Sequence, residues 1–422
     1  MTNQERLQEN NNLIKEIRQL LEDKMLVAAG GTKVIDIELP EKFAKANTIY
    51  MYKVNKDIIL FSSGASQTGL WRYSVKDDEL KQLVTWGYSL QNYYSITDNL
   101  VMITSNSSSN PFLVYDIKED SVTELAVGFM GTINAKKIDG NRFLISSGGS
   151  SSRGLYVFDV RTKQLTKVHS AGYDYESFAQ MGDYWFVGSG GNGGLLKFNS
   201  LTNEVTVLRA ENPWLYLNVI DDKLYFSSSG STAIAGLYVY DNSTGVETTI
   251  DDANKSWQSV FKIGNKTYTS NYANTATVQG LYEIENNQLK QVYPDGNDYR
   301  YAPMINDRAI ITGSASFVLV FDTSNGSFTK INESNAKMLG NFIVLGNKMI
   351  LTPTSSMSSR LYVYNYDANT LTPYSNFSFY NYDEFKQDGD NCYISSKTPN
   401  RPIVYYTNAD DSLKVVGYRV EV

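Results

Sequence analysis

The chain has 422 residues, of which 42% are hydrophobic and 20% are charged, and its formal net charge is −7. This acidic balance argues against nucleic-acid binding, because no basic stripe is present to neutralise phosphates. No run reaches the roughly 18 apolar residues of a membrane-spanning helix. The N-terminus lacks the apolar core of a secretion signal, so we expect a protein made in the cytoplasm without a signal peptide.

The first 27 residues are the part of the chain with helical periodicity. Leu7, Ile14 and Leu21 recur every seven residues, Ile17 lies on the same stripe, and the run ends at a Gly pair, 30–31. A lone helix of this size is marginal in water. We therefore predict that residues 1–27 pack either on the rest of the chain or in a short coiled coil or larger assembly. Leu7, Ile14, Ile17 and Leu21 are the predicted assembly contacts.

The beginning of this segment carries a family resemblance. Residues 4–14 read Gln-Glu-Arg-Leu-Gln-Glu-Asn-Asn-Asn-Leu-Ile. This run resembles the N-termini of tail-tip and tail-fibre proteins in phages of Gram-positive bacteria, in which a short helical segment attaches the fibre to the baseplate. Some receptor-binding proteins of such phages carry a propeller head behind a helical stem. The resemblance covers about 25 residues and implies attachment to other tail or baseplate proteins, in a virion.

Residues 28–45 are predicted to form a linker, in which residues 33–39 alternate like a strand that would lock a ring by pairing with the last repeat. From residue 46 to the C-terminus a tight-turn signal then recurs nine times, about every 42 residues. Each turn separates two runs rich in Val, Ile, Tyr and Phe, which is typical of a two-residue β-hairpin. The turns are Asn55-Lys56, Asp98-Asn99, Gly140-Asn141, Gly182-Asp183, Asp221-Asp222, Gly264-Asn265, Asn306-Asp307, Gly346-Asn347 and Gly389-Asp390.

A second motif has the same period. About fifteen residues after each turn comes a strand that reads Leu-Tyr-Val-Tyr-Asp or a variant of it, as at residues 155–159, 237–241 and 361–365. Each repeat then holds four short antiparallel strands, the content of one propeller blade. The predicted fold class is all-β: a β-propeller of nine four-stranded repeats with a short N-terminal helix. One nine-bladed ring is favoured, because no linker or composition shift separates any two repeats; an eight-bladed ring with a displaced repeat and two smaller propellers are the alternatives.

The reactive residues are few. His169 is the sole histidine, at the end of a fourth strand, and Cys392 is the sole cysteine. Catalysis by Ser-His-Asp or Cys-His groups and His/Cys metal sites therefore have little basis. We expect His169 on the surface and Cys392 as a small apolar residue in a strand. The acidic turns at 295–298 and 388–391 lack the full calcium loop, so we expect turns, no metal and no cofactor.

Aromatic residues cluster in the segments that enter the first strand of each repeat. Beside Asn, Asp and Ser side chains, exposed aromatic rings suit stacking on sugars. The alternative is that they pack between blades. The predicted ligand contacts are Trp86, Tyr88, Tyr173, Tyr175, Trp214, Trp257, Tyr299 and Tyr382.

The sequence thus predicts a non-enzymatic tail-fibre or baseplate propeller that binds a bacterial surface polymer, in particular a carbohydrate, with self-association as a further possibility. A purely structural assembly protein is the alternative. A glycan-cleaving propeller with paired carboxylates is the third reading.

Overall fold

The computed structural model describes the chain from residue 49 to residue 418 with gaps. The described residues are 49–54, 57–63, 69–74, 76–85, 90–105, 112–125, 133–147, 154–170, 175–190, 193–210, 214–228, 236–251, 257–271, 280–295, 299–313, 317–332, 342–352, 361–374, 382–396 and 402–418. Every regular element among them is a strand. The predicted helix 1–27, with Leu7, Ile14, Ile17 and Leu21, and the predicted strand 33–39 lie outside these residues.

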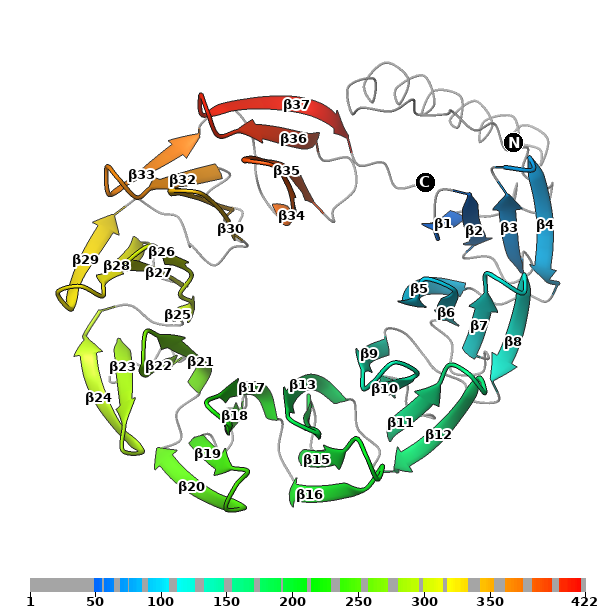
Figure 1. Cartoon of the computed structure of the whole chain (residues 1–422), viewed down its shortest axis with the longest axis horizontal. Coiled ribbons are helices and arrows are strands. Elements are labelled where there is room, and N and C mark those ends of the chain that lie inside the picture. The colour runs from blue at the N-terminus through cyan, green and yellow to red at the C-terminus, as the bar shows by residue number, and fades with distance from the viewer. Residues whose placement is uncertain are drawn as a thin grey trace, which may run out of the picture. The chain divides into compact units, whose positions relative to one another are not determined.

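The strands form nine antiparallel sheets in the described part of the chain, which we number in chain order (Figure 1). The first compact unit, up to residue 213, holds sheets 1–4. Their strands are β1 (Ile49–Lys53), β2 (Ile58–Ser63), β3 (Leu70–Ser74) and β4 (Glu79–Val84); β5 (Leu90–Thr97), β6 (Leu100–Ser105), β7 (Phe112–Asp116) and β8 (Ser121–Leu125); β9 (Ile133–Lys137), β10 (Arg142–Ser147), β11 (Gly154–Asp159) and β12 (Gln164–His169); β13 (Tyr175–Met181), β14 (Tyr184–Ser189), β15 (Leu195–Asn199) and β16 (Val205–Arg209).

The second compact unit, from residue 214, holds sheets 5–9. Sheet 7 has five strands because its first strand is split into β25 and β26, and both pieces pair with β27. The strands are β17 (Trp214–Ile220), β18 (Lys223–Ser228), β19 (Leu237–Asp241) and β20 (Val246–Asp251); β21 (Trp257–Ile263), β22 (Lys266–Asn271), β23 (Leu281–Glu285) and β24 (Gln288–Tyr293); β25 (Tyr299–Tyr301), β26 (Met304–Ile305), β27 (Arg308–Gly313), β28 (Phe317–Asp322) and β29 (Ser327–Asn332); β30 (Phe342–Leu345), β31 (Lys348–Leu351), β32 (Leu361–Asn365) and β33 (Thr370–Tyr374); β34 (Tyr382–Asp388), β35 (Asn391–Ser396), β36 (Pro402–Thr407) and β37 (Ser412–Tyr418).

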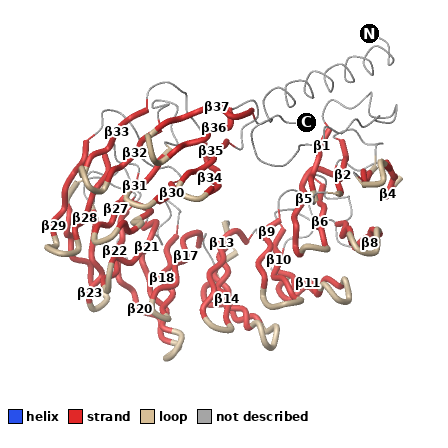
Figure 2. Tube along the Cα trace, turned by 45° about the horizontal axis from the view of Figure 1, so that its top comes forward, coloured by secondary structure: helices blue, strands red, loops and turns tan. Residues whose placement is uncertain are grey.

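The predicted hairpin turns join the first and second strands of the sheets, as the tan segments of Figure 2 show. Ile220 pairs with Lys223 across Asp221-Asp222, whose φ angles are 48° and 58°. Such left-handed turn residues match the twist of the flanking strands. Gly182, Gly264, Gly346 and Gly389 hold the first turn position at φ of 57° to 60°. The two-residue turn prediction is confirmed at the other described turns but not at Gly140-Asn141, where the Ile138 N–H donates to the Arg142 carbonyl oxygen at 2.8 Å and the loop 139–141 has three residues. Asn55-Lys56 lies outside the described residues.

The Leu-Tyr-Val-Tyr-Asp motif is the third strand, and its last residue shapes the next turn. The Asp241 Oδ1 accepts hydrogen bonds from the backbone N–H of Ser243 at 2.9 Å and of Thr244 at 3.3 Å. Gly245 then adopts φ 69°, and β20 begins. This is an Asx turn, in which a side-chain carboxylate replaces a backbone acceptor. Equivalent bonds are made by Asp116, Asp159, Asn199, Asp322 and Asn365.

The core lies between consecutive sheets of each unit. Leu60 and Leu70 of sheet 1 pack against Val101 and Leu113 of sheet 2, and all four side chains are buried. Comparable clusters lie between sheets 2 and 3, 3 and 4, 5 and 6, 6 and 7, 7 and 8, and 8 and 9. A single four-stranded sheet has two apolar faces to cover, so stacking in chain order buries what one repeat alone leaves exposed. The chain has the blades of a β-propeller; the number of rings that they close stays a prediction.

Candidate functional site

Trp257, a predicted ligand contact, is the first residue of β21 and has no exposed surface. Its indole Nε1 donates to the Asp251 Oδ2 at 2.8 Å, and its ring meets the Tyr282 ring edge-on with centroids 5.3 Å apart. The side chain belongs to the apolar cluster between sheets 5 and 6. Trp257 therefore packs two sheets together and cannot stack on a sugar.

Tyr175 and Tyr299 open β13 and β25 in the same way, with 1% and 0% of their surface exposed. The Tyr299 hydroxyl donates to the Asp295 carbonyl oxygen at 2.7 Å. Burial raises the pKa of Tyr175 to about 12, and burial also raises the pKa of Tyr299. The prediction that Tyr175, Trp257 and Tyr299 contact a ligand is wrong, because a ring without exposed surface has no face to offer; the packing alternative holds for these three.

A repeated link between sheets explains why aromatic residues occupy this position. The Ser146 Oγ donates to the Tyr175 carbonyl oxygen at 2.5 Å, and the Ser270 Oγ donates to the Tyr299 carbonyl oxygen at 3.0 Å. Ser227 bonds the Trp257 carbonyl oxygen in the same way. The register then shifts by one residue, a β-bulge that re-aims the following side chains. The first residue of the strand is thereby held against the preceding sheet, where a large ring fills the space.

For the other five predicted ligand contacts the structure describes the backbone at most. Trp214 and Tyr382 begin β17 and β34, the position equivalent to Trp257, with the same register shift after them. The side chains of these two are outside what the structure describes. Trp86, Tyr88 and Tyr173 lie outside the described residues altogether.

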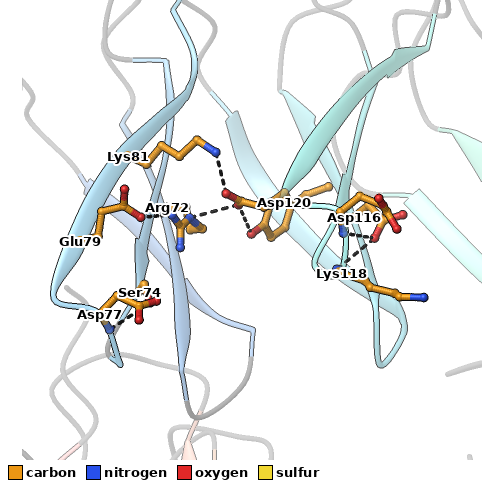
Figure 3. A network of polar contacts seen from close by, with 10 residues as sticks. Arg72, Ser74, Asp77, Glu79, Lys81, Asp116, Lys118 and Asp120 are labelled. Carbon is orange, nitrogen blue, oxygen red and sulfur yellow. Dashed lines mark hydrogen bonds and ion pairs between the residues drawn. The ribbon is translucent and has the colours of Figure 1, made fainter.

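A polar network that the sequence analysis did not single out links sheets 1 and 2 (Figure 3). Arg72 lies in β3 at the place of Val in the repeated motif, with 7% of its surface exposed. Its guanidinium donates to the Glu79 Oε2 at 2.5 Å. Its Nε forms an ion pair with the Asp120 Oδ1 at 3.1 Å, without the alignment of a hydrogen bond. Arg72 is therefore an arginine buried between two carboxylates.

Asp120 is the centre of that network. Arg72 and Lys81 are direct cross-strand partners, so their like charges repel. Asp120 lies in the β7–β8 turn. Its Oδ2 accepts a hydrogen bond from the Lys81 Nζ at 2.6 Å, and its Oδ1 accepts one from the Tyr115 hydroxyl at 2.9 Å. Burial acts to raise the pKa of Asp120, but the hydrogen bonds from Lys81 and Tyr115 and the Arg72 charge together lower it. The network joins the two sheets electrostatically, and an ionised Asp120 is a poor proton donor at neutral pH.

Two more charged side chains replace the motif's Val. Glu283 in β23 is 6% exposed, and its Oε1 forms an ion pair with the Lys266 Nζ at 2.8 Å. Lys197 in β15 is half-buried, with its Nζ 4.0 Å from the centroid of the Tyr184 ring. A charge at a strand position that is apolar in the other repeats was the available sequence signal for all three residues.

The nucleophile and base candidates offer little chemistry. Cys392 in β35 is fully buried, and burial raises the pKa of its thiol to about 12, so the prediction of a small apolar strand residue is confirmed. His169 is half-buried at the end of β12, so it is partly exposed as expected, and its ring lies edge-on to the Tyr175 ring with centroids 6.1 Å apart. Burial and the Lys167 charge lower the pKa of His169. Neither residue is near the other in the chain or in one sheet.

The acidic turns are occupied by the protein's own cations and hydroxyls. Lys330 Nζ lies 2.5 Å from the Asp295 Oδ2, and the Tyr405 hydroxyl donates to the Asp388 Oδ2 at 3.0 Å. In the described part of the chain no group of three or more His, Cys, Asp or Glu residues is arranged to hold a metal ion. No helix among those residues is long and apolar enough to cross a membrane.

Comparison with known proteins gives structural likeness alone. No protein-family model matches the chain, and no curated protein matches it. Among solved structures, the computationally designed Ika8 protein is 11% identical with a TM-score of 0.47, covering 78% of this chain and 96% of that one. AztD from Citrobacter koseri is 11% identical with a TM-score of 0.41 (79% and 96% covered), and BamB from Moraxella catarrhalis is 11% identical with a TM-score of 0.39 (83% and 96%).

Proposed function

We propose that this chain is a non-enzymatic β-propeller of a phage or phage-like tail fibre or baseplate that binds a bacterial surface polymer, in particular a carbohydrate. The described sheets use their buried rings and charges to hold neighbouring sheets together. Ligand contacts are therefore assigned to the connections between strands. The N-terminal segment 1–27 is the proposed attachment to other tail proteins.

The composition of one set of connections carries the proposal. The nine segments that join the second strand to the third contain no Asp or Glu, and they are rich in Ser, Thr, Asn and Gly. They are residues 64–69, 106–111, 148–153, 190–194, 229–236, 272–280, 314–316, 352–360 and 397–401. At the other end of the strands the turns are acidic, as at Asp183, Asp222 and Asp307.

An acid-free set of hydroxyl and amide groups suits a hydroxylated polymer. Hydroxyls and carboxamides donate and accept at once, which matches the mixed hydrogen bonding of sugar hydroxyls. The absence of carboxylates also keeps this end from repelling an anionic envelope, which a chain of net charge −7 otherwise does. Nine similar weak contacts on one chain, and several chains in one tail, multiply affinity through effective concentration.

A wall-binding assay tests the proposal. Purified protein is incubated with isolated Gram-positive cell walls, and bound protein is measured by sedimentation. The double variant Ser151→Asp/Ser355→Asp puts carboxylates into two acid-free connections, and we expect it to lose binding. The matched control Thr166→Asp/Thr206→Asp adds the same charge at exposed fourth-strand positions and is expected to bind as wild type. Equal binding by both double variants, or no binding by wild type to any wall, would reject a surface-polymer role.

The two other readings predict different results. A purely structural tail protein assembles but binds no wall, and deletion of residues 1–27 abolishes assembly. A glycan-cleaving propeller releases reducing ends from the polymer, and one acid-to-amide change abolishes that release. In the proposed binder, the deletion removes assembly and leaves wall binding intact.

A further inference from the structure

A basic side chain at the start of a second strand reaches the next sheet in three places. In sheet 3, the Arg142 guanidinium donates to the Ser200 carbonyl oxygen at 2.7 Å and to the Asn203 Oδ1 at 3.1 Å, both in the β15–β16 turn of sheet 4. Ser200 is the first residue of the loop 200–203 and Asn203 the last, because the Asn199 N–H donates to the Glu204 carbonyl oxygen at 2.9 Å and closes the loop there. The basic side chain thus fills the slot between two sheets at their turn-bearing end.

Sheets 7 and 8 repeat this contact. Arg308 Nη1 donates to the Tyr366 carbonyl oxygen at 2.7 Å, in the turn of sheet 8. Lys348 Nζ donates to the Asn408 carbonyl oxygen at 2.9 Å and to the Asp411 Oδ1 at 2.8 Å, in the turn of sheet 9. Tyr366 and Asn408 are again the first turn residues, and Asp411 is the last. In these three sheets the basic side chain thus binds a backbone carbonyl oxygen of the next turn, and Arg142 and Lys348 also bind a side-chain oxygen of its last residue.

Lys223 of sheet 5 holds the same position, but the next sheet does not supply the turn. The β23–β24 turn of sheet 6 has only two residues, Asn286 and Asn287, where the others have four. No hydrogen bond or ion pair within 4.0 Å joins the Lys223 ammonium to another group of the described chain. Lys266, the fifth basic residue at this position, is held by Glu283 of its own sheet instead. Val239 stands at the place of Glu283, so the anionic neighbour of Lys223 is its cross-strand partner Asp241, which interacts with it electrostatically.

A cavity of about 110 Å³ remains at this position. Lys223 and Asp241 line it as charged groups, and Thr244, Thr248 and Asn287 line it as neutral polar groups. Val246, with 55% of its surface exposed, forms an apolar wall. A space of about 15 Å³ on the same measure admits one water, so this slot has room for a group of several heavy atoms.

We propose that the Lys223 slot binds a turn of a partner polypeptide, which presents one backbone carbonyl oxygen and one carboxamide or carboxylate side chain. The occupant replaces the turn that sheet 6 lacks, and Lys223 binds it as Arg142, Arg308 and Lys348 bind theirs. Asn287 and the hydroxyls of Thr244 and Thr248 form hydrogen bonds with the partner's backbone groups, and Val246 packs against the apolar part of its side chains. This contact lies at the opposite end of the strands from the acid-free connections, so it is independent of polymer binding.

A peptide probe tests the slot in the full-length chain. The probe is a fluorescent, disulfide-closed peptide with the sequence of residues 199–204, Asn-Ser-Leu-Thr-Asn-Glu, and binding is read by fluorescence polarisation. We expect saturable binding with a Kd on the order of 1 mM, because one small contact is weak. Lys223→Met is expected to weaken it at least about tenfold, the size of a charge-assisted hydrogen bond. Lys223→Arg is expected to retain it, and the control Lys266→Met leaves it unchanged.

A second variant fills the slot from within. Asn286 and Asn287 are replaced by the four turn residues of 200–203, and Glu285→Asn supplies the Asx acceptor. This variant is expected to lose peptide binding while it gains protection from hydrogen exchange in β18, and the gain disappears when Lys223→Met is added. Absence of saturable binding by wild type, equal binding by Lys223→Met, or displacement of the peptide by inorganic phosphate would each overturn the proposal; the last outcome would indicate an anion site.

Discussion

Replacing Trp257 by Ala is expected to open the interface between sheets 5 and 6 rather than to remove a ligand contact. The side chain is fully buried, and truncation of a buried Trp costs about 3–5 kcal/mol. The edge-on contact with Tyr282 and the hydrogen bond to Asp251 are lost as well, each worth about 1 kcal/mol. Since these terms overlap, we expect about 4 kcal/mol, a roughly thousandfold rise in the local opening constant.

Hydrogen exchange measured by mass spectrometry resolves this effect sheet by sheet, which suits a repeat protein whose sheets need not unfold together. Amides of β18, β21 and β22 are expected to exchange faster, while those of β6 and β7 keep their wild-type protection. Trp257→Phe, which keeps a ring and loses the indole donor, is expected to cost about 1–2 kcal/mol. Leu201→Ala, at a position 69% exposed, serves as the neutral control. Unchanged exchange in β21 and β22 of the Ala variant would refute the assignment of Trp257 to packing.

Three further predictions concern the scaffold. Gly194→Ala is expected to destabilise sheet 4 by more than about 2 kcal/mol in urea, because its Cβ would lie 2.0 Å from the backbone oxygen of Arg209, whereas Gly182→Ala, at a left-handed position in open space, is expected to cost about 1 kcal/mol. Asp120→Asn is expected to lower the free energy of unfolding by about 1–2 kcal/mol at pH 7. The stabilisation by ionised Asp120 is complete above the carboxyl's ordinary pKa of 3.8 and is lost as the pH falls through its lowered pKa in the folded chain, so below that pKa the substitution is expected to cost nothing. Cys392 is expected to resist maleimide at pH 8 until the protein unfolds, and mass spectrometry would detect the modification. Between the ordinary thiol pKa of 9.0 and the folded value of about 12, the folded chain retains a proton that the unfolded chain releases, so the free energy of unfolding falls as the pH rises through this range.

Local chemistry was sufficient to predict the sheets. A two-residue Gly, Asn or Asp turn between alternating apolar runs has one good conformation, so Asp221-Asp222 and its equivalents were predictable from sequence neighbours alone. The Asp that ends the third strand belongs to the repeated motif, but the sequence analysis did not predict that its carboxylate forms an Asx turn. Asp241 accepts from residues two and three positions later, a local bond that composition does not distinguish from a surface carboxylate.

The prediction for Tyr175, Trp257 and Tyr299 failed for a non-local reason. A Tyr or Trp that precedes a strand has the same sequence signature whether it faces solvent or the preceding sheet. The side is decided by the bulge after the residue and by a serine about 30 positions earlier, as for Ser227 and Trp257. Neither is visible in a local window. Arg72 was missed for a related reason, because its partner Asp120 belongs to the next repeat and its unusual position shows only when the repeats are aligned.

Departures from the repeat are where a repeated scaffold has room for function. Residues that recur in most sheets, such as the turn glycines and the third-strand Asp, serve conformation, and changing one is expected to cost stability first. A residue that departs from its equivalents is either compensated, as Arg72 is by Asp120 and Glu283 by Lys266, or left with an unmet requirement. Lys223 is of the second kind, because the turn that satisfies its equivalents is shortened in sheet 6. The Lys223 ammonium faces Asp241 across the strand pair but lies beside a lined cavity without the next-sheet carbonyl oxygen that Arg142, Arg308 and Lys348 bind, and this difference favours a partner from outside the chain.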